Sequence, residues 1–313
     1  MRLFAIVVPV VSILIAAPAP AAPPDRGLPW VTEAAHAPRV TFHTFDSAAA
    51  AGPVSYHVYA PAAYDDPAVR LPVLYWLHGT GGGIAGIAPL ARHIDAAIEA
   101  GRMPPLLVVF VNGLPGRLWA DAKDGSAPVE TVFVDELIPE IDRGYRTIAA
   151  REGRILEGFS MGGYGAARLG FRHPDRFAGI SILAGGPFDL DLDGPRARRN
   201  PRLKAAILRE VCAGDLAYFR EISPLTLAAP AAEQLRDRHT VIRHAVGIRD
   251  DTLDLNRQFH ERMTAVGIPH AYIEIPDVGH DPERVLAALA DRDPGFYRRV
   301  LTGGDAAAAG APE

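Results

Sequence analysis

The sequence predicts an α/β fold in which a mostly parallel central sheet carries helices on both faces. Two observations favour it. Short runs of aliphatic and β-branched residues alternate with segments whose apolar residues recur at helical spacing, and this alternation is typical of strand–helix–strand units. The 313 residues are 49% apolar and show no internal repeat or linker-like stretch, so we expect one large domain with a sizeable core.

The expected elements begin near residue 40. Residues 40–46 and 54–60 are rich in β-branched and aromatic residues, with a Gly-Pro pair between them, and are predicted to be strands. Later apolar runs are nearly continuous, which suits strands that are buried on both faces. These later strands are expected at 71–77, 106–111, 154–159, 177–183, 240–247 and 270–275, and helices at 87–98, 129–143, 165–171, 251–266 and 282–301.

Residues 185–238 interrupt this alternation. They hold three aspartates interleaved with leucines, a basic stretch and some helical pattern. A connection that leaves the carboxyl end of a parallel strand begins at the edge of the sheet where ligands bind. We therefore expect a cap-like insertion that covers part of the site and influences substrate choice. The alternative is a surface excursion remote from the site.

The N-terminus has the three-part layout of a secretory signal peptide. Met1 and Arg2 give a positive start, residues 3–15 are almost wholly apolar, and Ala19-Pro20-Ala21 fits the small-x-small rule for cleavage. An uncleaved anchor is the alternative, but the apolar run is shorter than the about 20 residues that span a bilayer. We expect a signal peptide at 1–21 and a secreted or periplasmic protein that leaves the membrane after cleavage.

The predicted mature domain covers residues 22–302, and the Gly/Ala-rich tail at 303–313 is expected to be disordered. A net charge of −5 with no long basic run argues against nucleic-acid binding. Cys212 is the one cysteine, which excludes an intrachain disulfide and a cysteine-based structural zinc site.

Residues 158–162 read Gly-Phe-Ser-Met-Gly and match the pattern G-x-S-x-G. A predicted strand precedes the motif and a predicted helix follows it, which is the context of a nucleophile elbow. Glycines flank the serine because a Cβ at either site would clash in so tight a turn. We expect the turn to present Ser160 Oγ at the carboxyl edge of the sheet, with the Met161 N–H aimed at a developing oxyanion.

A serine hydroxyl is a poor nucleophile without a base. His280 follows the last predicted strand, where this type of fold carries its base, and the acid should lie between serine and histidine in the chain. Asp250 follows the preceding strand and is our choice for the acid. Asp251 is the alternative, while Asp254 falls inside the predicted helix. Either Asp250 or Asp251 could instead cap that helix.

The segment His-Gly-Thr-Gly-Gly-Gly at 78–83 follows an early buried strand. A loop at this place supplies the second oxyanion N–H in such folds, and we expect Thr80 to give it, paired with Met161. Glycines such as Gly79 let the backbone approach the substrate carbonyl. Trp119 is expected either to line the acyl or sugar site or to pack in the core.

Three rival sites are weaker. Residues 81–86 match G-x-G-x-x-G, but the next predicted strand ends without the acidic residue that a dinucleotide site needs. His260-Glu261 begins like a zinc motif but lacks its second histidine. The aspartates that start at Asp189 resemble a calcium loop, yet its twelfth position is Asn200 rather than glutamate, so a solvated acidic loop is favoured. We expect neither a metal nor a cofactor.

Several of these motifs together resemble the putative-esterase family of α/β-hydrolases, which includes esterase D, feruloyl esterases and the antigen 85 mycolyltransferases. The resemblance covers roughly residues 40–300 and therefore implies an α/β-hydrolase fold. It rests on the segments 71–79, 136–139, 145–147, 158–165, 173–175 and 279–281.

The resemblance implies Ser160 as nucleophile and His280 as base. In the feruloyl-esterase branch the acid stands three residues after a glycine that ends a strand, which corresponds to Asp250. That branch also places the oxyanion donors at the residues that match Thr80 and Met161. Two departures are the glutamate at position 157, where a small or apolar residue is more usual, and the poorly matching insertion.

These inferences together predict a secreted serine carboxylesterase that hydrolyses feruloyl or acetyl esters of acylated carbohydrates through an acyl-enzyme. Its partner would be a small-molecule or polysaccharide ester. Two alternatives stay open. One is an acyltransferase of the mycolyltransferase type, with a sugar hydroxyl as acceptor. The other is a non-catalytic cell-wall binding protein on the same fold.

Overall fold

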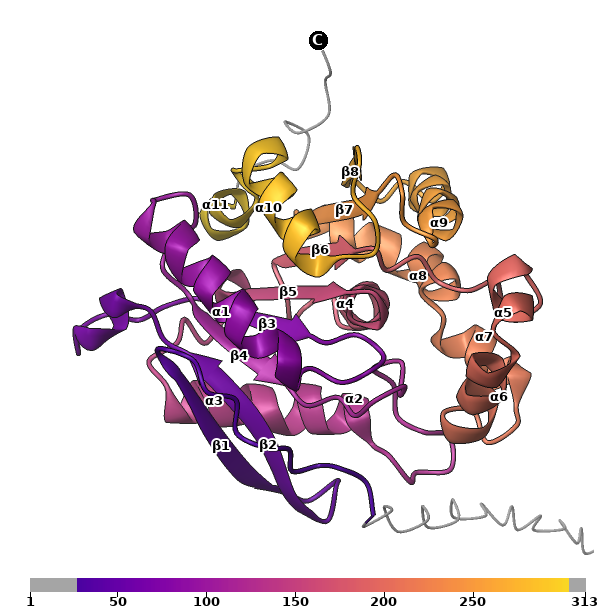
Figure 1. Ribbon diagram of the computed structural model, residues 1–313, viewed down its shortest axis with the longest axis horizontal. Helices are drawn as coiled ribbons and strands as arrows, with labels where there is room; N and C mark the ends of the chain where they lie inside the picture. Colours follow the sequence, from indigo (N-terminus) through magenta and orange to yellow (C-terminus); the bar gives the residue numbers. More distant parts are fainter. Residues whose placement is uncertain (1–26, 304–313) are drawn as a thin grey trace, which may run out of the picture.

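Eight strands form one sheet, in the order β1-β2-β4-β3-β5-β6-β7-β8, in the computed structural model, which describes residues 27–303 (Figure 1). Strands β3 to β8 run parallel to one another, while β1 and β2 form an antiparallel pair and β2 lies antiparallel to β4. The strands are β1 (Val40–Ser47), β2 (Gly52–Tyr59), β3 (Val73–Leu77), β4 (Leu107–Val111), β5 (Arg154–Phe159), β6 (Gly179–Leu183), β7 (Val241–Gly247) and β8 (Ala271–Ile275).

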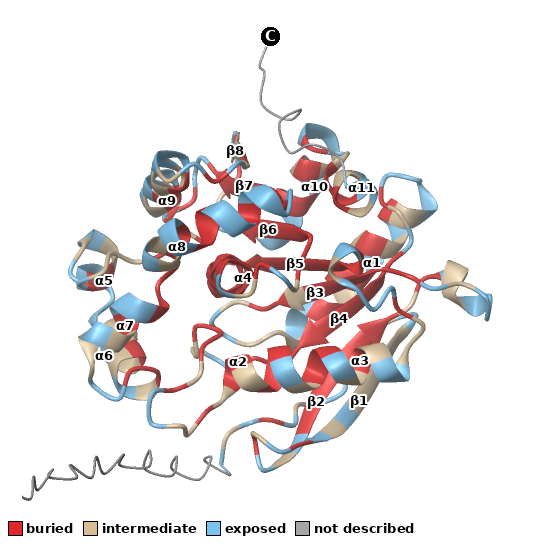
Figure 2. Cartoon of the chain, turned by 180° about the vertical axis from the view of Figure 1, so that it is seen from behind, coloured by how far each residue is buried: buried red, intermediate tan, exposed pale blue. Residues whose placement is uncertain are grey.

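Helices cover both faces of this sheet. Helices α1, α10 and α11 pack on one face, and α2, α3, α4, α8 and α9 pack on the other, so that buried apolar side chains form two clusters with the sheet between them (Figure 2). The helices are α1 (Ile84–Glu99), α2 (Val129–Thr131), α3 (Ile138–Gly144), α4 (Met161–Arg172), α5 (Pro195–Arg199), α6 (Pro201–Glu210), α7 (Leu216–Ile222), α8 (Pro224–Asp237), α9 (Leu253–Ala265), α10 (Pro282–Arg292) and α11 (Phe296–Thr302). A π-helical turn (Val132–Leu137) joins α2 to α3, and short 3-10 turns lie at Ala62–Asp65 and Arg151–Gly153.

The strand order reverses at β3, which places the candidate site. The chain passes from β3 to β4 on one side and later returns to β5 on the other side of β3. At such a switch point the carboxyl ends of neighbouring strands open a crevice for ligands. Ser160 follows directly on β5 and therefore stands at this crevice. The predicted α/β architecture is thus confirmed, with the antiparallel β1–β2 pair at one edge.

Several boundaries differ from the sequence-based expectation. Helix α1 begins at Ile84, β6 begins at Gly179, and the helical stretch expected at 282–301 divides into α10 and α11. Leu71 lies outside β3 and makes an isolated bridge to Thr147. Helix α4 begins at Met161 rather than at 165, because the closely packed turn holds Gly162 and Gly163 in helical conformation despite their low helix propensity. The insertion at 185–238 contains the four helices α5, α6, α7 and α8.

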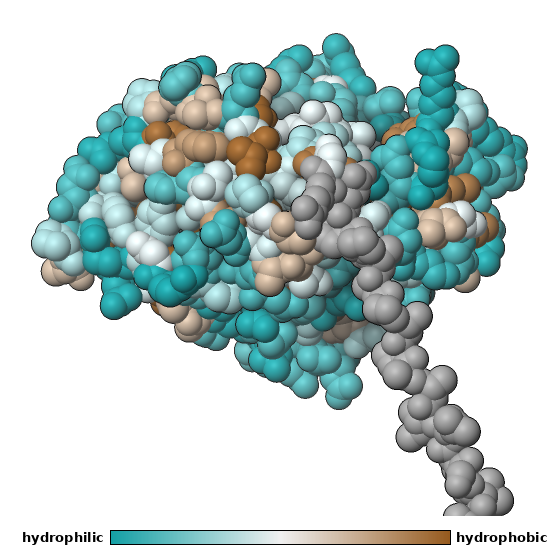
Figure 3. Space-filling view, turned by 90° about the horizontal axis from the view of Figure 1, so that it is seen from below, coloured by the Kyte–Doolittle hydropathy of each residue, from teal (hydrophilic) through white to brown (hydrophobic). Residues whose placement is uncertain are grey.

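Few large apolar side chains are exposed within the described range. The exposed large apolar side chains there are those of Val31, Ile148 and Ile248, and the face in Figure 3 shows only small apolar groups among hydrophilic ones. No helix between residues 27 and 303 has the length and apolar character needed to cross a bilayer. The predicted signal peptide at 1–21 and the tail, except Gly303, lie outside the described residues.

Glu157, the unusual residue before the serine motif, belongs to a buried ion pair. Its carboxylate accepts a hydrogen bond from Arg243 Nη2 at 2.8 Å and from the Tyr297 hydroxyl at 3.0 Å. The side chains of Glu157 and Arg243 are each only 2% exposed, and Arg243 also bonds Ser181 Oγ and lies 4.1 Å from the centre of the Phe296 ring. The glutamate therefore ties β5 to β7 and α11.

Replacing Glu157 with glutamine should destabilise the protein, because the charge of Arg243 would stay buried without its closest counter-charge. Removing one partner of a buried ion pair costs about 3 kcal/mol or more. Urea unfolding of the variant should show this loss. The matched change Glu152→Gln removes a charge that is 71% exposed and should shift stability by about 0.5 kcal/mol or less. Equal effects of the two changes would contradict the structural role of Glu157.

Candidate active site

Ser160 occupies a strained turn between β5 and α4. Its backbone has φ 60° and ψ −120°, a conformation that costs a residue with a side chain free energy and persists only where the surroundings enforce it. A Cβ on Gly158 would collide with the backbone of Gly162, and one on Gly162 would collide with the carbonyl oxygen of Leu77. Both glycines are therefore required for the turn that lifts Ser160 out of the sheet.

The structure brings Ser160, His280 and Asp250 into one hydrogen-bonded chain. His280 Nε2 lies 2.8 Å from Ser160 Oγ, and His280 Nδ1 lies 2.7 Å from Asp250 Oδ2. An ionised Asp250 can only accept, so Nδ1 carries the proton and Nε2 is free to accept from the serine hydroxyl. This is the arrangement in which an imidazole acts as general base toward a serine.

Neighbouring loops hold the acid and the base in place. The loop after β7 carries Asp250 and the loop after β8 carries His280. Backbone hydrogen bonds of 2.9 Å join the two loops, from Ile248 N to Ile275 O and from Arg249 N to Val278 O. The Phe159 ring, 4.7 Å from the His280 ring between centres, packs on the imidazole.

Asp250 and Asp251 have different surroundings. The Asp250 carboxylate is buried, and its Oδ1 accepts from Thr252 N at 2.8 Å and Thr252 Oγ1 at 2.6 Å. Burial acts to raise its pKa, but the hydrogen bonds from His280 and Thr252 outweigh burial and hold the pKa of Asp250 below its usual range. Asp251 is exposed and pairs with Arg196 at 2.8 Å. Of the two, Asp250 is thus the one that bonds His280.

The candidate oxyanion donors come from two elements, Thr80 from the loop after β3 and Met161 from the start of α4. Thr80 and Met161 line one pocket together with Ser160. As the first residue of α4, Met161 has a backbone N–H with no acceptor within its helix. Gly79 lines the neighbouring pocket that also contains Ser160 and His280. Thr80, Met161 and Gly79 therefore all line pockets that reach Ser160.

His78 supports this loop, a role that sequence reasoning missed. Its Nδ1 lies 2.7 Å from Gly79 O, and Gly113 N donates to its Nε2 at 3.1 Å. Burial lowers the pKa of His78 to about 4, so the ring is neutral and donates through Nδ1. The histidine thus fixes the glycine-rich loop to the loop after β4. Its position directly before the loop glycines was the available signal.

Trp119 does not line the site, and the hypothesis that it contacts the acyl or sugar group is wrong. Its side chain is fully buried and its Nε1 donates to His78 O at 3.2 Å. A Cβ on Gly113 or Gly165 would collide with its ring. Core packing, the alternative considered from the sequence, is the observed role. Through its hydrogen bond to His78 O the indole also supports the loop that follows β3.

Two pockets meet at Ser160. One of about 310 Å³ contains Ser160 and His280 and is walled by the end of β3, the glycine-rich loop after it, α1 and α10. The other, of about 60 Å³, lies toward the insertion. Its walls include five residues of the insertion, namely Gly186, Phe188, Arg196, Leu203 and Ile207. The insertion therefore lies beside the serine and not on a remote surface.

The three aspartates of the acidic loop, at 189, 191 and 193, all bond to other groups of this chain. Asp189 accepts from the backbone N–H groups of Asp193 at 2.9 Å and Gly194 at 2.7 Å. Asp193 pairs with Arg198 at 2.8 Å and Asp191 pairs with Arg220 at 2.5 Å. These contacts fit the favoured interpretation of a solvated acidic loop.

Comparison with known protein families shows to which family this chain is related. The sequence pattern of the family described as "Putative esterase" matches residues 47–281. The chain belongs to this family. The match confirms the resemblance inferred from the sequence motifs.

Two curated relatives match different shares of this chain. The endo-1,4-beta-xylanase/feruloyl esterase of Xylanibacter ruminicola is 33% identical over 143 residues, which are 42% of this chain and 19% of the relative. An esterase of Mycobacterium tuberculosis is 26% identical over 276 residues, which are 81% of this chain and 58% of the relative. The chain thus spans less than two thirds of the length of either relative.

Solved structures share the architecture. A ferulic acid esterase superposes with a TM-score of 0.67 at 24% identity, covering 83% of this chain and 98% of that protein. An S-formylglutathione hydrolase from Agrobacterium tumefaciens gives 0.67 at 18% identity, covering 84% and 95%. At these identities the likeness concerns the fold, which is the α/β-hydrolase fold.

Proposed function

We propose that this chain is a secreted serine carboxylesterase. The observation that carries the proposal is the hydrogen-bonded chain of Ser160, His280 and Asp250, with distances of 2.8 and 2.7 Å, at the switch point of the sheet. Membership of an esterase family and a relative named as a feruloyl esterase support it. The signal-like N-terminus supports export.

In the proposed reaction each residue of the site has a defined role. His280 Nε2 takes the proton of Ser160 as Oγ attacks the ester carbonyl, and Asp250 stabilises the imidazolium that forms. The N–H groups of Thr80 and Met161 bind the oxyanion of the tetrahedral intermediate. His280 then gives the proton to the leaving alcohol, which breaks the ester bond. Water, deprotonated by the same histidine, hydrolyses the acyl-enzyme and releases the acid.

The alcohol and acyl parts of the ester can each be matched to one of the two pockets at Ser160. The leaving oxygen must come within hydrogen-bond reach of His280 Nε2, so the alcohol occupies the pocket of about 310 Å³ that His280 lines. The acyl group then faces the pocket of about 60 Å³. So little room favours an acetyl group over a feruloyl group. The substrate class we propose is therefore the acetyl or similarly short acyl ester of an acylated carbohydrate.

Leu203 should limit the length of the acyl chain, because its side chain walls the smaller pocket. We expect kcat/KM of the unaltered protein to fall from p-nitrophenyl acetate to the octanoate. Leu203→Ala should raise the octanoate-to-acetate ratio of kcat/KM about tenfold, the lower end of what one methylene changes in a hydrophobic pocket. The matched control Leu208→Ala, on the same helix but outside the pocket, should keep the original ratio. A Leu203 variant with an unchanged ratio would refute the assignment of this pocket to the acyl group.

Turnover of p-nitrophenyl acetate, with and without glycerol or trehalose, tests the proposed activity. Steady release of free acetate in the absence of either alcohol supports hydrolysis. Product that forms only with an added alcohol would instead indicate an acyltransferase. No release of p-nitrophenol at all would favour a binding protein on the same fold.

A further inference from the structure

We propose that a second pocket, beside the alcohol side of the site, binds a neutral aromatic ring carried by the alcohol part of the substrate. An acetylated aryl glycoside is an ester of this kind. This inference rests on the proposed function for its place in catalysis. The binding site itself can be tested without catalysis.

The pocket lies between β2, β4 and the start of α1, and has a volume of about 360 Å³. It is thus at least as large as the pocket that holds Ser160 and His280, at about 310 Å³. Trp76, His78 and the segment Gly81 to Gly83 line both pockets. The two spaces are therefore neighbours that share one wall.

The shared wall is thin. Gly81 to Gly83 carry no side chains, and a Cβ added to Gly81 would meet nothing within 4 Å. Gly82 has a φ of +89°, which disfavours any residue with a side chain at this point. The Gly81–Gly83 part of the shared wall, at which no side chain stands between the two spaces, is where an alcohol that extends from an ester at Ser160 would pass into the second pocket.

The second pocket is uncharged. Its lining residues in the described part of the chain include no aspartate, glutamate, lysine or arginine. The two lining histidines are neutral near pH 7, because burial lowers the pKa of His57 to about 4 and that of His78 to about 4. An ionic group would lose its hydration here without finding a counter-charge. The occupant is therefore neutral.

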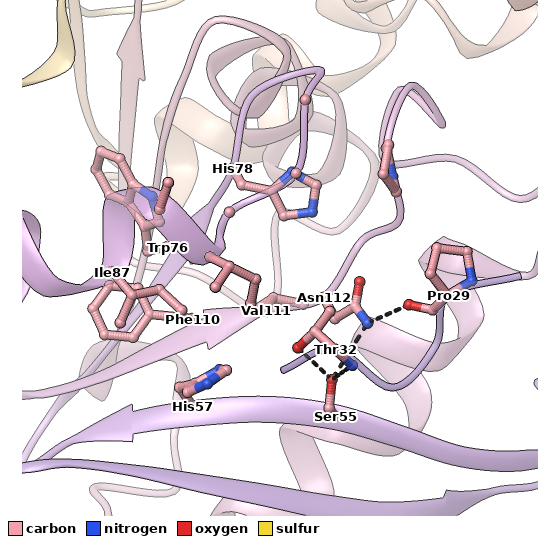
Figure 4. A pocket seen from close by; sticks show the side chains of 16 residues that line it. Pro29, Thr32, Ser55, His57, Trp76, His78, Ile87, Phe110, Val111 and Asn112 are labelled. Atoms are coloured by element: carbon pink, nitrogen blue, oxygen red, sulfur yellow. Dashed lines mark hydrogen bonds between the residues drawn. The ribbon is translucent and has the colours of Figure 1, made fainter. Parts of the chain in front are cut away.

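Figure 4 shows two ends of this pocket. Trp76, Ile87 and Phe110 gather at one end, and Thr32 and Ser55 lie with Asn112 at the other. Trp76, at the aromatic end, also lines the pocket that contains Ser160, so this end faces the catalytic residues. Flat aromatic faces pack well against a ring that enters from that side.

The polar end has little hydrogen-bonding capacity left for a sugar. The Asn112 side chain donates to Pro29 O at 3.0 Å and Trp30 O at 2.9 Å, and accepts from Leu114 N at 3.2 Å. The hydroxyls of Thr32 and Ser55 bond to each other at 3.0 Å. A sugar ring needs several partners for its hydroxyls, so these occupied groups favour an aromatic ring.

His57 supplies a donor for one acceptor on that ring. Its Nε2 accepts from Ala35 N at 2.9 Å, so the proton of the neutral imidazole is on Nδ1. The hydrogen bond from Ala35 N occupies Nε2 and leaves Nδ1–H as the donor of this ring, which lines the pocket. An ether or phenol oxygen on the ligand would accept this proton. The expected occupant is thus an aromatic ring with a neutral oxygen substituent.

The experiment measures binding of 4-methoxyphenol to the unaltered protein by calorimetry. Ala85 is exposed and lines this pocket but not the pocket with Ser160, so Ala85→Trp fills it selectively. Ala96 is also exposed on α1 and lines neither pocket, so Ala96→Trp is the matched control. We expect Ala85→Trp to weaken binding at least about tenfold and Ala96→Trp to leave it unchanged, with circular dichroism checking that both variants fold.

Three results would overturn the proposal: no binding of 4-methoxyphenol, equal binding by the Ala85→Trp variant, or equally tight binding of 4-methoxybenzoate or methyl glucoside. In the active protein, Ala85→Trp should also lower the kcat/KM ratio of an acetylated phenyl glycoside to the acetylated methyl glycoside about tenfold. Binding of the phenol by a protein without esterase activity would refute the proposed function and leave the pocket assignment standing.

Discussion

Replacing Ser160 with alanine is expected to abolish ester hydrolysis while leaving the fold intact. Loss of a triad nucleophile lowers kcat by about 10⁶. The hydroxyl makes one hydrogen bond, to His280, and its strained backbone conformation is set by the surrounding glycines, so stability should change little. Steady-state turnover of p-nitrophenyl acetate and thermal unfolding of the purified variant measure the two effects. Near-normal turnover by a preparation free of other esterases would falsify the role of Ser160.

Asp250→Asn should cost about 10⁴ in kcat, because an asparagine amide in that place favours the wrong tautomer of His280. Asp251→Asn should cost far less, since Asp251 pairs with Arg196 at the surface. The comparison is sharp because the two positions are adjacent and the change is the same. The kcat of both variants with p-nitrophenyl acetate is the measurement.

If the Asp251 variant were the inactive one, the hydrogen bond between His280 and Asp250 would not be the one that serves catalysis. If both variants kept full activity, neither carboxylate would orient the base. Circular dichroism of the two proteins separates these outcomes from misfolding, which matters because Asp250 also accepts two hydrogen bonds from Thr252.

The fold followed from the sequence because several of its strands are nearly continuous apolar runs that end at turn residues. The run of five apolar residues in β4 lies within the strand expected at 106–111, since both faces of that strand are covered and no polar alternation obscures it. The serine turn could be placed for the same reason: its glycines stand where a strand meets a helix.

Side-chain contacts between distant segments could not be predicted in this way. The partners of Glu157 are Arg243 and Tyr297, which lie 86 and 140 residues along the chain, and no local pattern connects them. Trp119 was ambiguous for a similar reason, because its burial depends on the glycines at 113 and 165 that leave room for its ring. The choice between Asp250 and Asp251 depended on a turn in which Asp250 N donates to Gly247 O.

Covalent labelling of Ser160 tests the central claim most directly. Paraoxon should transfer a diethylphosphoryl group to the activated serine hydroxyl, since it reacts with a serine whose proton a histidine can accept. Mass spectrometry of the proteolysed protein is predicted to find the added group on the peptide that contains Ser160, and to find none after His280→Ala. Failure to label the protein, or a label on another residue with Ser160 unmodified, would contradict the account.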